Sequence, residues 1–380
     1  MINGKIVELV EQYYPFTKEQ RARWEDIRDR MLELSPEVEQ GIREMDRLLS
    51  KLGDSHTRIK NLTPNRSIFV IDIYFESDQL MLREHDKSYP IVELNGMTTD
   101  QIQQMYQEHY GWEWPFVKRH LIREIKFGEG MFAKPELQVR YTKHGKLVEK
   151  MWRQTNISEI CTQLSQDQIE TLKTVKGISS KQIDESLFYI RISSFFQREI
   201  PALFLETLQR MDIRTKRIVL DIRDHQGGYV DVAKELVSYM IDQDIKLDFE
   251  AENKEGLREQ YVVNSRYQKE LEGKKLSLLI NENTQSSAEY LFARALKLAH
   301  PNLEIIGTET AGLSGQAKEF FIDQKYLLTI TTRRYVDVVT KKQVGKGMHP
   351  TVIVKDDIHS GKDACMEWIM NHHCSKEVAG

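Results

Sequence analysis

Short apolar strands alternate with amphipathic helices between residues 185 and 355, and this alternation constrains the fold more than any other feature of the chain. Residues 217–222 are expected to form a buried strand that runs into a double-glycine turn, and residues 276–280 a second buried strand that leads into another helix. Consecutive strand–helix–strand units imply parallel strands joined by right-handed crossovers. We therefore predict an α/β domain with a mostly parallel sheet over residues 185–355.

Two smaller parts and a tail are predicted around this domain. Residues 1–62 are expected to form an N-terminal helical segment, because apolar residues recur at helical spacing up to a stop signal at Gly53. Residues 66–160 are expected to form a small mixed α/β module, compatible with a PDZ-like fold, in which a strand ends in an Asn-Gly turn. Residues 356–380 are predicted to be a C-terminal tail with one amphipathic segment.

Composition excludes several classes of protein. The 380 residues carry a net charge of −4 and their basic residues are spread along the chain, so we expect no nucleic-acid partner. No apolar stretch approaches the roughly 20 residues of a membrane helix, and the N-terminus lacks a basic segment followed by an apolar run. Three cysteines are too few for a disulfide framework. These features predict a cytoplasmic protein without a membrane partner.

Ser286 is the candidate nucleophile, because it stands at the start of an apolar-periodic helix. A serine hydroxyl needs a base to take its proton and preorganised donors where the oxyanion forms. The unpaired N–H groups of a first helical turn can supply such donors, so the N–H of Ser287 is expected to be one. Gly227 or Gly228 is expected to offer the second, because glycine lets the backbone approach a substrate closely. The alternative is that Ser286 or Ser287 is only a helix N-cap.

Four segments occur in the order of the motifs of one peptidase family, which contains the C-terminal processing (tail-specific) proteases and tricorn protease, and the chain resembles that family. They are Asp-Ile-Arg-Asp-His-Gln-Gly-Gly at 221–228, Thr-Gln-Ser-Ser-Ala-Glu at 284–289, Gly-Thr-Glu-Thr-Ala-Gly at 307–312 and Gly-Met-His-Pro-Thr at 347–351. The resemblance covers residues 185–355 and extends to 52–57 and, loosely, to 66–155. It implies a crotonase/ClpP-like main domain, a substrate-handling small module and a nucleophile at Ser286.

The base that the resemblance implies is His56. One branch of the family uses a lysine 25 residues after the nucleophile, where this chain has Ala311. The tricorn-like branch uses a histidine preceded by a serine, and Ser55-His56 matches it. An unperturbed histidine has a pKa of roughly 6.5, so it accepts a proton near pH 7. Lysine-type members also carry a histidine in this segment, so a structural role for His56 is the alternative.

Two positions depart from the family pattern. The tricorn-like branch has a glutamate where this chain has Val344, and valine cannot orient a histidine. The asparagine of the first motif is replaced by His225, which we interpret as a turn residue, with a substrate-side group as the alternative. Other residues could take the place of the glutamate, and the sequence does not choose among Asp54, Glu289, Glu309, Gln343 and His349.

The C-terminal region contains residues of the types that bind zinc, but their spacing matches no closed site. They are Cys365, His372, His373 and Cys374. The double glycine lacks the Lys-Ser/Thr of a phosphate loop, so a nucleotide is not expected. We therefore expect no metal, and acyl transfer by a serine requires no cofactor.

The sequence thus predicts a serine peptidase with Ser286 as nucleophile, His56 as base and Ser55 holding the imidazole. The family implies an extended peptide or unfolded protein as substrate, and a homo-oligomer is compatible with the sequence. Two other functions stay open. One is a peptide-binding member of the family that has lost catalysis, and the other is a hydrolase of a non-peptide ester or thioester on the related crotonase-like architecture.

Overall fold

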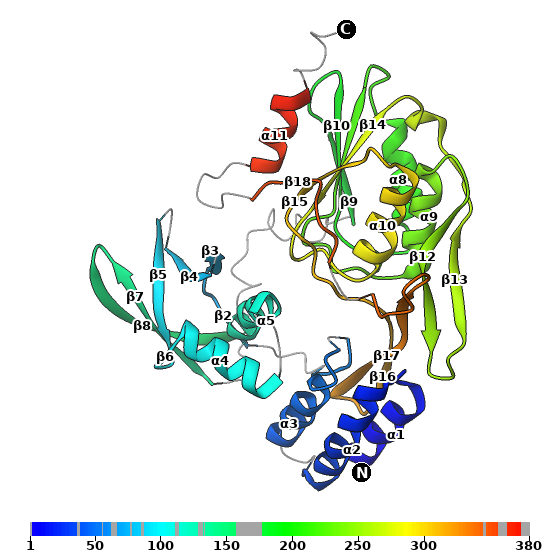
Figure 1. The fold of residues 1–380 in the computed structure, drawn as a ribbon. Helices are drawn as coiled ribbons and strands as arrows, with labels where there is room; N and C mark the ends of the chain where they lie inside the picture. Colours follow the sequence, from blue (N-terminus) through cyan, green and yellow to red (C-terminus); the bar gives the residue numbers. More distant parts are fainter. Residues whose placement is uncertain are drawn as a thin grey trace. The chain divides into compact units, whose positions relative to one another are not determined.

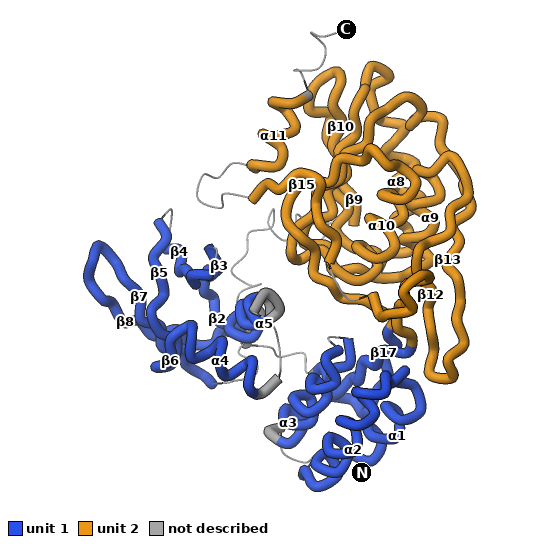
Figure 2. The backbone as a smooth tube through the Cα atoms, viewed as in Figure 1, with its two compact units in different colours: residues 1–170, 317–332 blue, residues 171–316, 333–380 orange. Residues whose placement is uncertain are grey.

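The computed structural model (Figure 1) describes residues 2–35, 39–54, 56–61, 67–76, 78–84, 87–110, 114–127, 132, 134–156, 177–344, 347–355 and 363–373. The chain forms two compact units (Figure 2). The first unit is residues 1–170 with 317–332, and the second unit is residues 171–316 with 333–380. Each unit is therefore assembled from two separate pieces of sequence. Within the described residues, no helix is long and apolar enough to cross a membrane.

The second unit contains a central sheet in the order β18-β15-β14-β11-β10-β9 (Figure 1). Its strands are β9 (Ile178–Gln182), β10 (Leu187–Ile192), β11 (Arg217–Asp221), β14 (Lys275–Ile280), β15 (Glu304–Gly307) and β18 (Val352–Ile353). Neighbouring strands from β10 to β18 run parallel, and β9 is antiparallel to β10. β11 is buried along its whole length, as its apolar sequence predicts.

Helices cover both faces of the central sheet. They are α8 (Ile200–Gln209), α9 (Val230–Met240), the π-helical turn η3 (Ala288–Ala293), α10 (Arg294–Ala299) and α11 (Ala364–His373). On β11, Ile218 and Leu220 belong to the core that α8, α9, η3 and α10 share. Val219 belongs to a separate core with Cys365 and Ile369 of α11. Because side chains alternate along a strand, two covered faces require an apolar residue at every position.

A second, antiparallel sheet in this unit pairs β12 (Ile245–Asn253) with β13 (Arg258–Val263) and with residues 333–337 of β17 (Tyr326–Asp337). Phe249, Tyr261 and Tyr335 pack together there, with ring centroids between 4.5 and 5.9 Å apart. These rings belong to the same core as α8, α9 and α10. The hairpin of β12 and β13 is absent from the sequence-based prediction.

In the first unit, helices pack against a small antiparallel sheet. The elements are α1 (Ile2–Tyr13), α2 (Lys18–Glu33), α3 (Glu39–Ser50), β1 (Arg58–Asn61), residues 317–321 of β16 (Gln316–Phe321) and residues 326–332 of β17. Trp24 on α2 and Leu48 on α3 share one core with Leu328 and Ile330 of β17. α1 to α3 lie within the range predicted as the N-terminal helical segment, and α3 ends before Gly53, which has a φ of 70°.

A small module of the first unit has a core of its own, formed by buried residues between 69 and 141. Its elements are β2 (Ser67–Phe69), β3 (Ile73–Glu76), β4 (Gln79–Glu84), β5 (Lys87–Leu94), β6 (Met97–Thr98), α4 (Thr99–Tyr110), α5 (Trp114–Phe127), β7 (Glu136–Lys143) and β8 (Lys146–Asn156). Asn95-Gly96 and His144-Gly145 make the hairpin turns, with positive φ at both positions of each turn. That conformation belongs to the type I′ turn that an Asn-Gly pair favours.

The chain is therefore a mixed α/β protein, as predicted. Among the described strands, parallel pairing is confined to the central sheet, and strands elsewhere pair antiparallel. The mostly parallel sheet expected over residues 185–355 describes the central sheet alone, because β12, β13 and β17 in the same range pair antiparallel. The predicted limits of the parts, at residues 62, 66, 160, 185 and 355, stay predictions.

Candidate active site

The carboxyl ends of two adjacent parallel strands position the first two motifs. β11 and β14 pair in register, with Asp221 opposite Leu279. The segments that follow these strands, 222–229 and 281–287, therefore leave the sheet side by side. Open α/β sheets bind their ligands at this edge, where the strands end.

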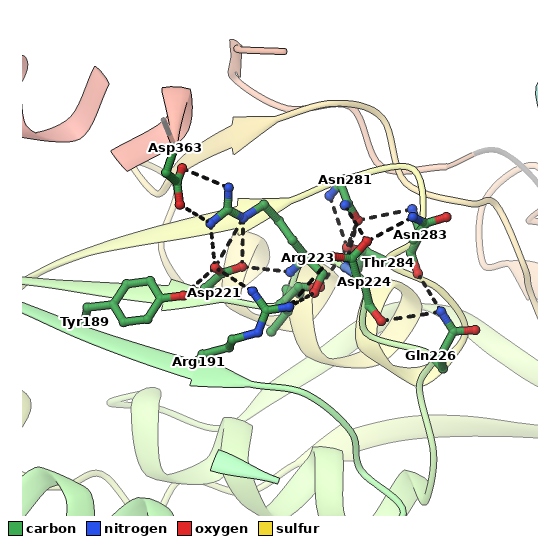
Figure 3. Close-up of polar contacts among 11 residues, drawn as sticks. Tyr189, Arg191, Asp221, Arg223, Asp224, Gln226, Asn281, Asn283, Thr284 and Asp363 are labelled. Atoms are coloured by element: carbon green, nitrogen blue, oxygen red, sulfur yellow. Dashed lines mark hydrogen bonds and ion pairs between the residues drawn. The ribbon is translucent and has the colours of Figure 1, made fainter. Parts of the chain in front are cut away.

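An ion-pair network fixes the end of β11 (Figure 3). The fully buried Asp221 carboxylate accepts hydrogen bonds from the Tyr189 hydroxyl at 2.6 Å and from the Arg223 guanidinium at 2.7 Å. Arg223 also donates to both carboxylate oxygens of Asp363, at 2.9 and 2.6 Å. Burial opposes the charge of Arg223, but its bonds to the two carboxylates raise its pKa above the ordinary value. The glycine turn thus starts from a rigid anchor that also holds the start of α11.

Asp224 joins the two segments. Its N–H donates to Asn281 Oδ1, and its carboxylate accepts from the side-chain amides of Asn281 and Asn283, each at 2.9 Å (Figure 3). The Thr284 hydroxyl donates to the Ile222 carbonyl at 2.8 Å. Asp224 has a φ of 61°, a left-handed conformation that aspartate tolerates better than most residues. These polar bonds hold the nucleophile segment against the glycine turn.

Ser286 has a left-handed backbone, with a φ of 58°. Non-glycine residues seldom adopt this conformation, and a tight strand-to-helix turn of this kind is where hydrolases expose a nucleophile. The helix follows at once, since the Ser286 carbonyl accepts from the N–H of Glu289 at 3.1 Å and of Tyr290 at 2.9 Å. The Ser287 hydroxyl does not cap this helix and instead donates to the Gly228 carbonyl at 3.0 Å. The N-cap alternative therefore does not describe Ser287.

The double-glycine turn lies directly against the nucleophile segment. A Cβ on Gly227 would stand 2.8 Å from Ser286 Cβ and 3.2 Å from the Ser287 nitrogen. A Cβ on Gly228 would stand 2.4 Å from the carbonyl carbon of Phe195. Their φ angles are 86° and 138°, so both space and conformation require glycine. No described residue accepts a hydrogen bond from the N–H of Gly228 or of Ser287, which leaves two backbone donors on neighbouring segments.

His225 holds the first glycine of the turn. Its Nδ1 accepts the N–H of Gly227 at 2.9 Å, and its ring centroid lies 4.1 Å from that of Phe195. Burial lowers the pKa of His225 to about 3, and the charge of Arg191 acts in the same direction. The imidazole is therefore neutral at pH 7. A fully buried side chain fits the turn role expected for His225 rather than the alternative of a substrate-side group.

The third motif, residues 307–312, is hydrogen-bonded to the nucleophile segment. The N–H of Ala311 donates to the Thr284 carbonyl at 2.9 Å, and the N–H of Gly312 donates to a carboxylate oxygen of Glu289 at 3.0 Å. Ala311 is the position where the lysine branch of the family has its base. Here that position contributes its backbone to the turn and has no side chain that could take a proton.

The fourth motif is joined to the third. Thr310 and Met348 exchange two hydrogen bonds, from the N–H of Thr310 to the Met348 carbonyl at 3.1 Å and from the N–H of Met348 to the Thr310 hydroxyl at 2.7 Å. Val344 packs against the apolar core, so no acid stands where the family pattern has glutamate. His349 Nδ1 lies 3.4 Å from a carboxylate oxygen of Glu309, and both side chains are exposed. The four motifs of the second unit thus form one continuous hydrogen-bonded site.

His56 lies in the first unit, in the loop after α3. Its N–H donates to Asp54 Oδ1 at 2.9 Å, and Asp54 Oδ2 accepts from the Thr57 hydroxyl at 2.7 Å. The N–H of Thr331 donates to the same Thr57 oxygen at 3.1 Å, which ties the loop to β17. Burial lowers the pKa of His56 below its ordinary value, against the opposing charge of Asp54. Ser55, the predicted support for the imidazole, lies outside the described residues.

The structure brings together Ser286, Ser287, Gly227 and Gly228 at one edge of the central sheet. His56 belongs to the other unit, so its approach to Ser286 stays a prediction. The sequence gives the candidate nucleophile and both candidate donor segments, because each lies in a motif with a local signature.

Three supporting residues are not among those that the sequence predicts for the site. Asn281 and Asn283 follow a buried strand, where polar turn residues are expected, so a local signal for them existed. Asp363 is 140 residues away from its partner Arg223. A single sequence offers no means to pair two charges at that separation.

No group of histidine, cysteine and acidic side chains in the described part of the chain is placed to hold a metal ion. Cys365, one of the zinc-compatible residues, lies on α11 and is buried in the core that this helix shares with the central sheet. Cys374 lies outside the described residues.

Comparison with known proteins gives a family and several structural neighbours. The model of peptidase family S41 matches residues 186–354, which contain all four motifs of the second unit. A search of curated protein sequences found no match.

Two solved structures illustrate the likeness of fold. The photosystem II D1 C-terminal processing protease has 14% identity and a TM-score of 0.55, over 93% of this chain and 92% of that one. Mature CPAF complexed with lactacystin has 13% identity and a TM-score of 0.68, over 98% of each chain. At identities this low the likeness establishes the fold and nothing finer.

Proposed function

Residues 186–354 belong to peptidase family S41, a family of serine peptidases, and from this we propose that Ser286 attacks a peptide carbonyl with His56 as its general base. The match to the family model confirms the family and the enzyme class that the sequence predicts. The left-handed Ser286 at the head of η3, next to the glycine turn, is the observation that carries the choice of nucleophile.

We assign the stabilisation of the oxyanion to two donors, the backbone N–H groups of Ser287 and Gly228. This choice is supported by the lack of an acceptor for either group among the described residues. Gly227, the other glycine considered, donates its N–H to His225 and is therefore occupied. Removal of one donor from an oxyanion hole costs about 10²–10³ in kcat, so the assignment concerns a large part of the rate enhancement.

His56 takes the proton of the Ser286 hydroxyl in this mechanism and later gives it to the leaving amine. Burial lowers its pKa and so favours the neutral imidazole, which is the form that accepts a proton. Asp54 holds the backbone of His56, and Ser55 is the proposed support for its ring. Val344 supplies no acid, so the imidazolium that forms is stabilised less than in a complete triad.

The proposed substrate is an extended peptide or an unfolded protein chain. One structural neighbour is a C-terminal processing protease, which suggests cleavage near a C-terminus as the first specificity to test. The crotonase/ClpP-like classification of the main domain, a cytoplasmic location and a homo-oligomer are further proposals from the sequence. The chemistry needs no cofactor.

A fluorophosphonate probe, with the labelled residue mapped by mass spectrometry, tests the mechanism. We expect the label on Ser286, no labelling of Ser286→Ala, and labelling of His56→Ala slower by at least about 100-fold, the usual contribution of a general base. His300→Ala serves as the matched control, because His300 bonds to the Met240 carbonyl away from the motifs. A label on another residue contradicts the assignment.

The loss of the acid at Val344 favours one second function, a peptide-binding protein without catalysis. Folded wild-type protein that resists the probe yet binds an unstructured peptide would establish that function instead. Hydrolysis of esters or thioesters but not peptides in a substrate panel would favour the third function considered from the sequence.

A further inference from the structure

His225 is a fully buried histidine that the proposed mechanism does not use. It lies between β11 and the double glycine, and it is hydrogen-bonded to the glycine turn and to the segment that carries Ser286. Its Nδ1 accepts the Gly227 N–H at 2.9 Å, and its carbonyl accepts the N–H of Gln285 at 2.9 Å. One residue therefore ties the glycine turn to the segment that carries Ser286.

The acceptor role of Nδ1 fixes the form of the ring. A neutral imidazole has one N–H and one acceptor nitrogen, so the proton of His225 belongs on Nε2. Nε2 is buried and has no hydrogen-bond partner among the described residues. Burial of an unpaired N–H costs free energy. The favourable contacts of the ring are therefore the hydrogen bond to Nδ1 and the packing of its apolar face.

The apolar face of the ring packs on Phe195, with the two centroids 4.1 Å apart. Phe195 is also a backbone partner of the glycine turn, because its N–H donates to the Gly227 carbonyl at 2.9 Å. The Gly227 carbonyl and the Gly228 N–H belong to the same planar trans peptide and point in opposite directions. The bond from Phe195 therefore aims the Gly228 N–H away from Phe195.

We propose that His225 is a positioning residue for the oxyanion hole, which holds the Gly227 N–H with Nδ1 and supports Phe195 with its ring. Together these contacts set both peptides of the double glycine, so that the N–H of Gly228 is preorganised for the oxyanion. The proposal rests on the proposed function. A preorganised donor lowers the barrier because it needs no reorientation during the reaction.

Three substitutions separate the acceptor from the ring. His225→Phe keeps an aromatic ring and removes the acceptor, whereas His225→Asn keeps an acceptor that can reach the N–H two residues later. His225→Leu is a second variant without an acceptor, to be used if the phenylalanine variant does not fold. His300→Phe is the matched control, because His300 lies in the same unit outside the motifs.

The measurements are kcat and KM on an unstructured peptide, the labelling rate with a fluorophosphonate, and the affinity for a peptide boronate that forms a tetrahedral adduct. We expect His225→Phe to lower kcat and the labelling rate by about 100-fold, with KM changed by less than about three-fold. Boronate affinity is expected to fall with kcat. His225→Asn is expected to recover kcat to within about ten-fold of the wild type, and His300→Phe to change none of these quantities.

Two results would overturn the positioning role while leaving the peptidase intact. One is a folded His225→Phe or His225→Leu variant with the kcat of the wild type. The other is an equal loss of kcat in the Asn and Phe variants, because the acceptor would then not matter. Folded wild type that the probe does not label would refute the proposed function itself, and this outcome is distinguishable because it involves no variant.

Discussion

At the scale of single residues, the site concentrates backbone strain where the chemistry is proposed. Ser286 and Asp224 are non-glycine residues with positive φ, and Gly227 and Gly228 extend the same unusual turn geometry. Such conformations persist only when surrounding contacts enforce them. The hydrogen bonds that the Asp224 carboxylate accepts from the side-chain amides of Asn281 and Asn283 are contacts of that kind.

Replacement of Ser286 tests the strain directly. We expect the free energy of unfolding of Ser286→Gly to be about 1 kcal/mol higher than that of Ser286→Ala. A left-handed backbone costs free energy for alanine, whereas glycine adopts it without this cost. Urea denaturation of the two variants gives the difference. At Ser238, which lies in the interior of α9, the order is expected to reverse, since glycine is about 1 kcal/mol worse than alanine within a helix. The same order at both positions would contradict a strained Ser286.

His225 makes stability depend on pH in a defined direction. Its folded pKa is about 3 and its unfolded pKa roughly 6.5, so between these values the unfolded chain binds more protons. The contribution of His225 to the free energy of unfolding is complete above pH 6.5 and is lost as the pH falls toward 3. Between pH 7 and pH 5 we expect the wild type to lose about 2 kcal/mol more than His225→Asn in urea denaturation. Parallel losses in the two proteins would show that His225 does not titrate in this way.

At the scale of elements, local patterns predict most strands and helices of the second unit, because β11, β14 and the helices that follow them have unmistakable periodicity. The hairpin of β12 and β13 escaped although β12 alternates buried and exposed residues. Its Lys254-Glu255-Gly256 turn lacks the Asn-Gly signature that identified the hairpin after β5. The sequence predicts the helix that follows the nucleophile, but it contains no signal for the π-helical first part of that helix.

The anchoring of α11 gives a prediction at this scale. Asp363 accepts from both terminal nitrogens of Arg223, and its carboxylate also accepts the N–H of Met366 at 3.0 Å, which caps the helix. We expect Asp363→Ala to cost about 1 kcal/mol, as the loss of an N-cap does. Cys365, the buried second residue of α11, should then react faster with a thiol reagent, as measured by peptide-resolved mass spectrometry. Met370→Ala, on the exposed side of the same helix, should leave that rate unchanged, and an unchanged rate in Asp363→Ala would refute the anchor.

At the scale of the whole molecule, the order of parts along the chain differs from the order in which they pack. Residues 317–332 leave the second unit and complete the core of the N-terminal helices through Ile322, Leu328 and Ile330. The hydrogen bond from Thr331 to Thr57 spans 274 residues. Periodicity reports only on neighbours in sequence, so the sequence predicts the N-terminal helices but not the strand that they pack against.

This difference predicts which pieces of the chain fold alone. The core of the small module, residues 67–156, is formed entirely by side chains of that segment. The core of residues 1–61, in contrast, includes apolar side chains of residues 317–332. We therefore expect an isolated 67–156 fragment to unfold cooperatively in urea, since domains of this size bury enough surface to be stable. An isolated 1–61 fragment should lack a cooperative transition, and a fusion of 1–61 to 317–332 should regain one. Cooperative unfolding of 1–61 alone, or none in 67–156, would show that the cores are not divided in this way.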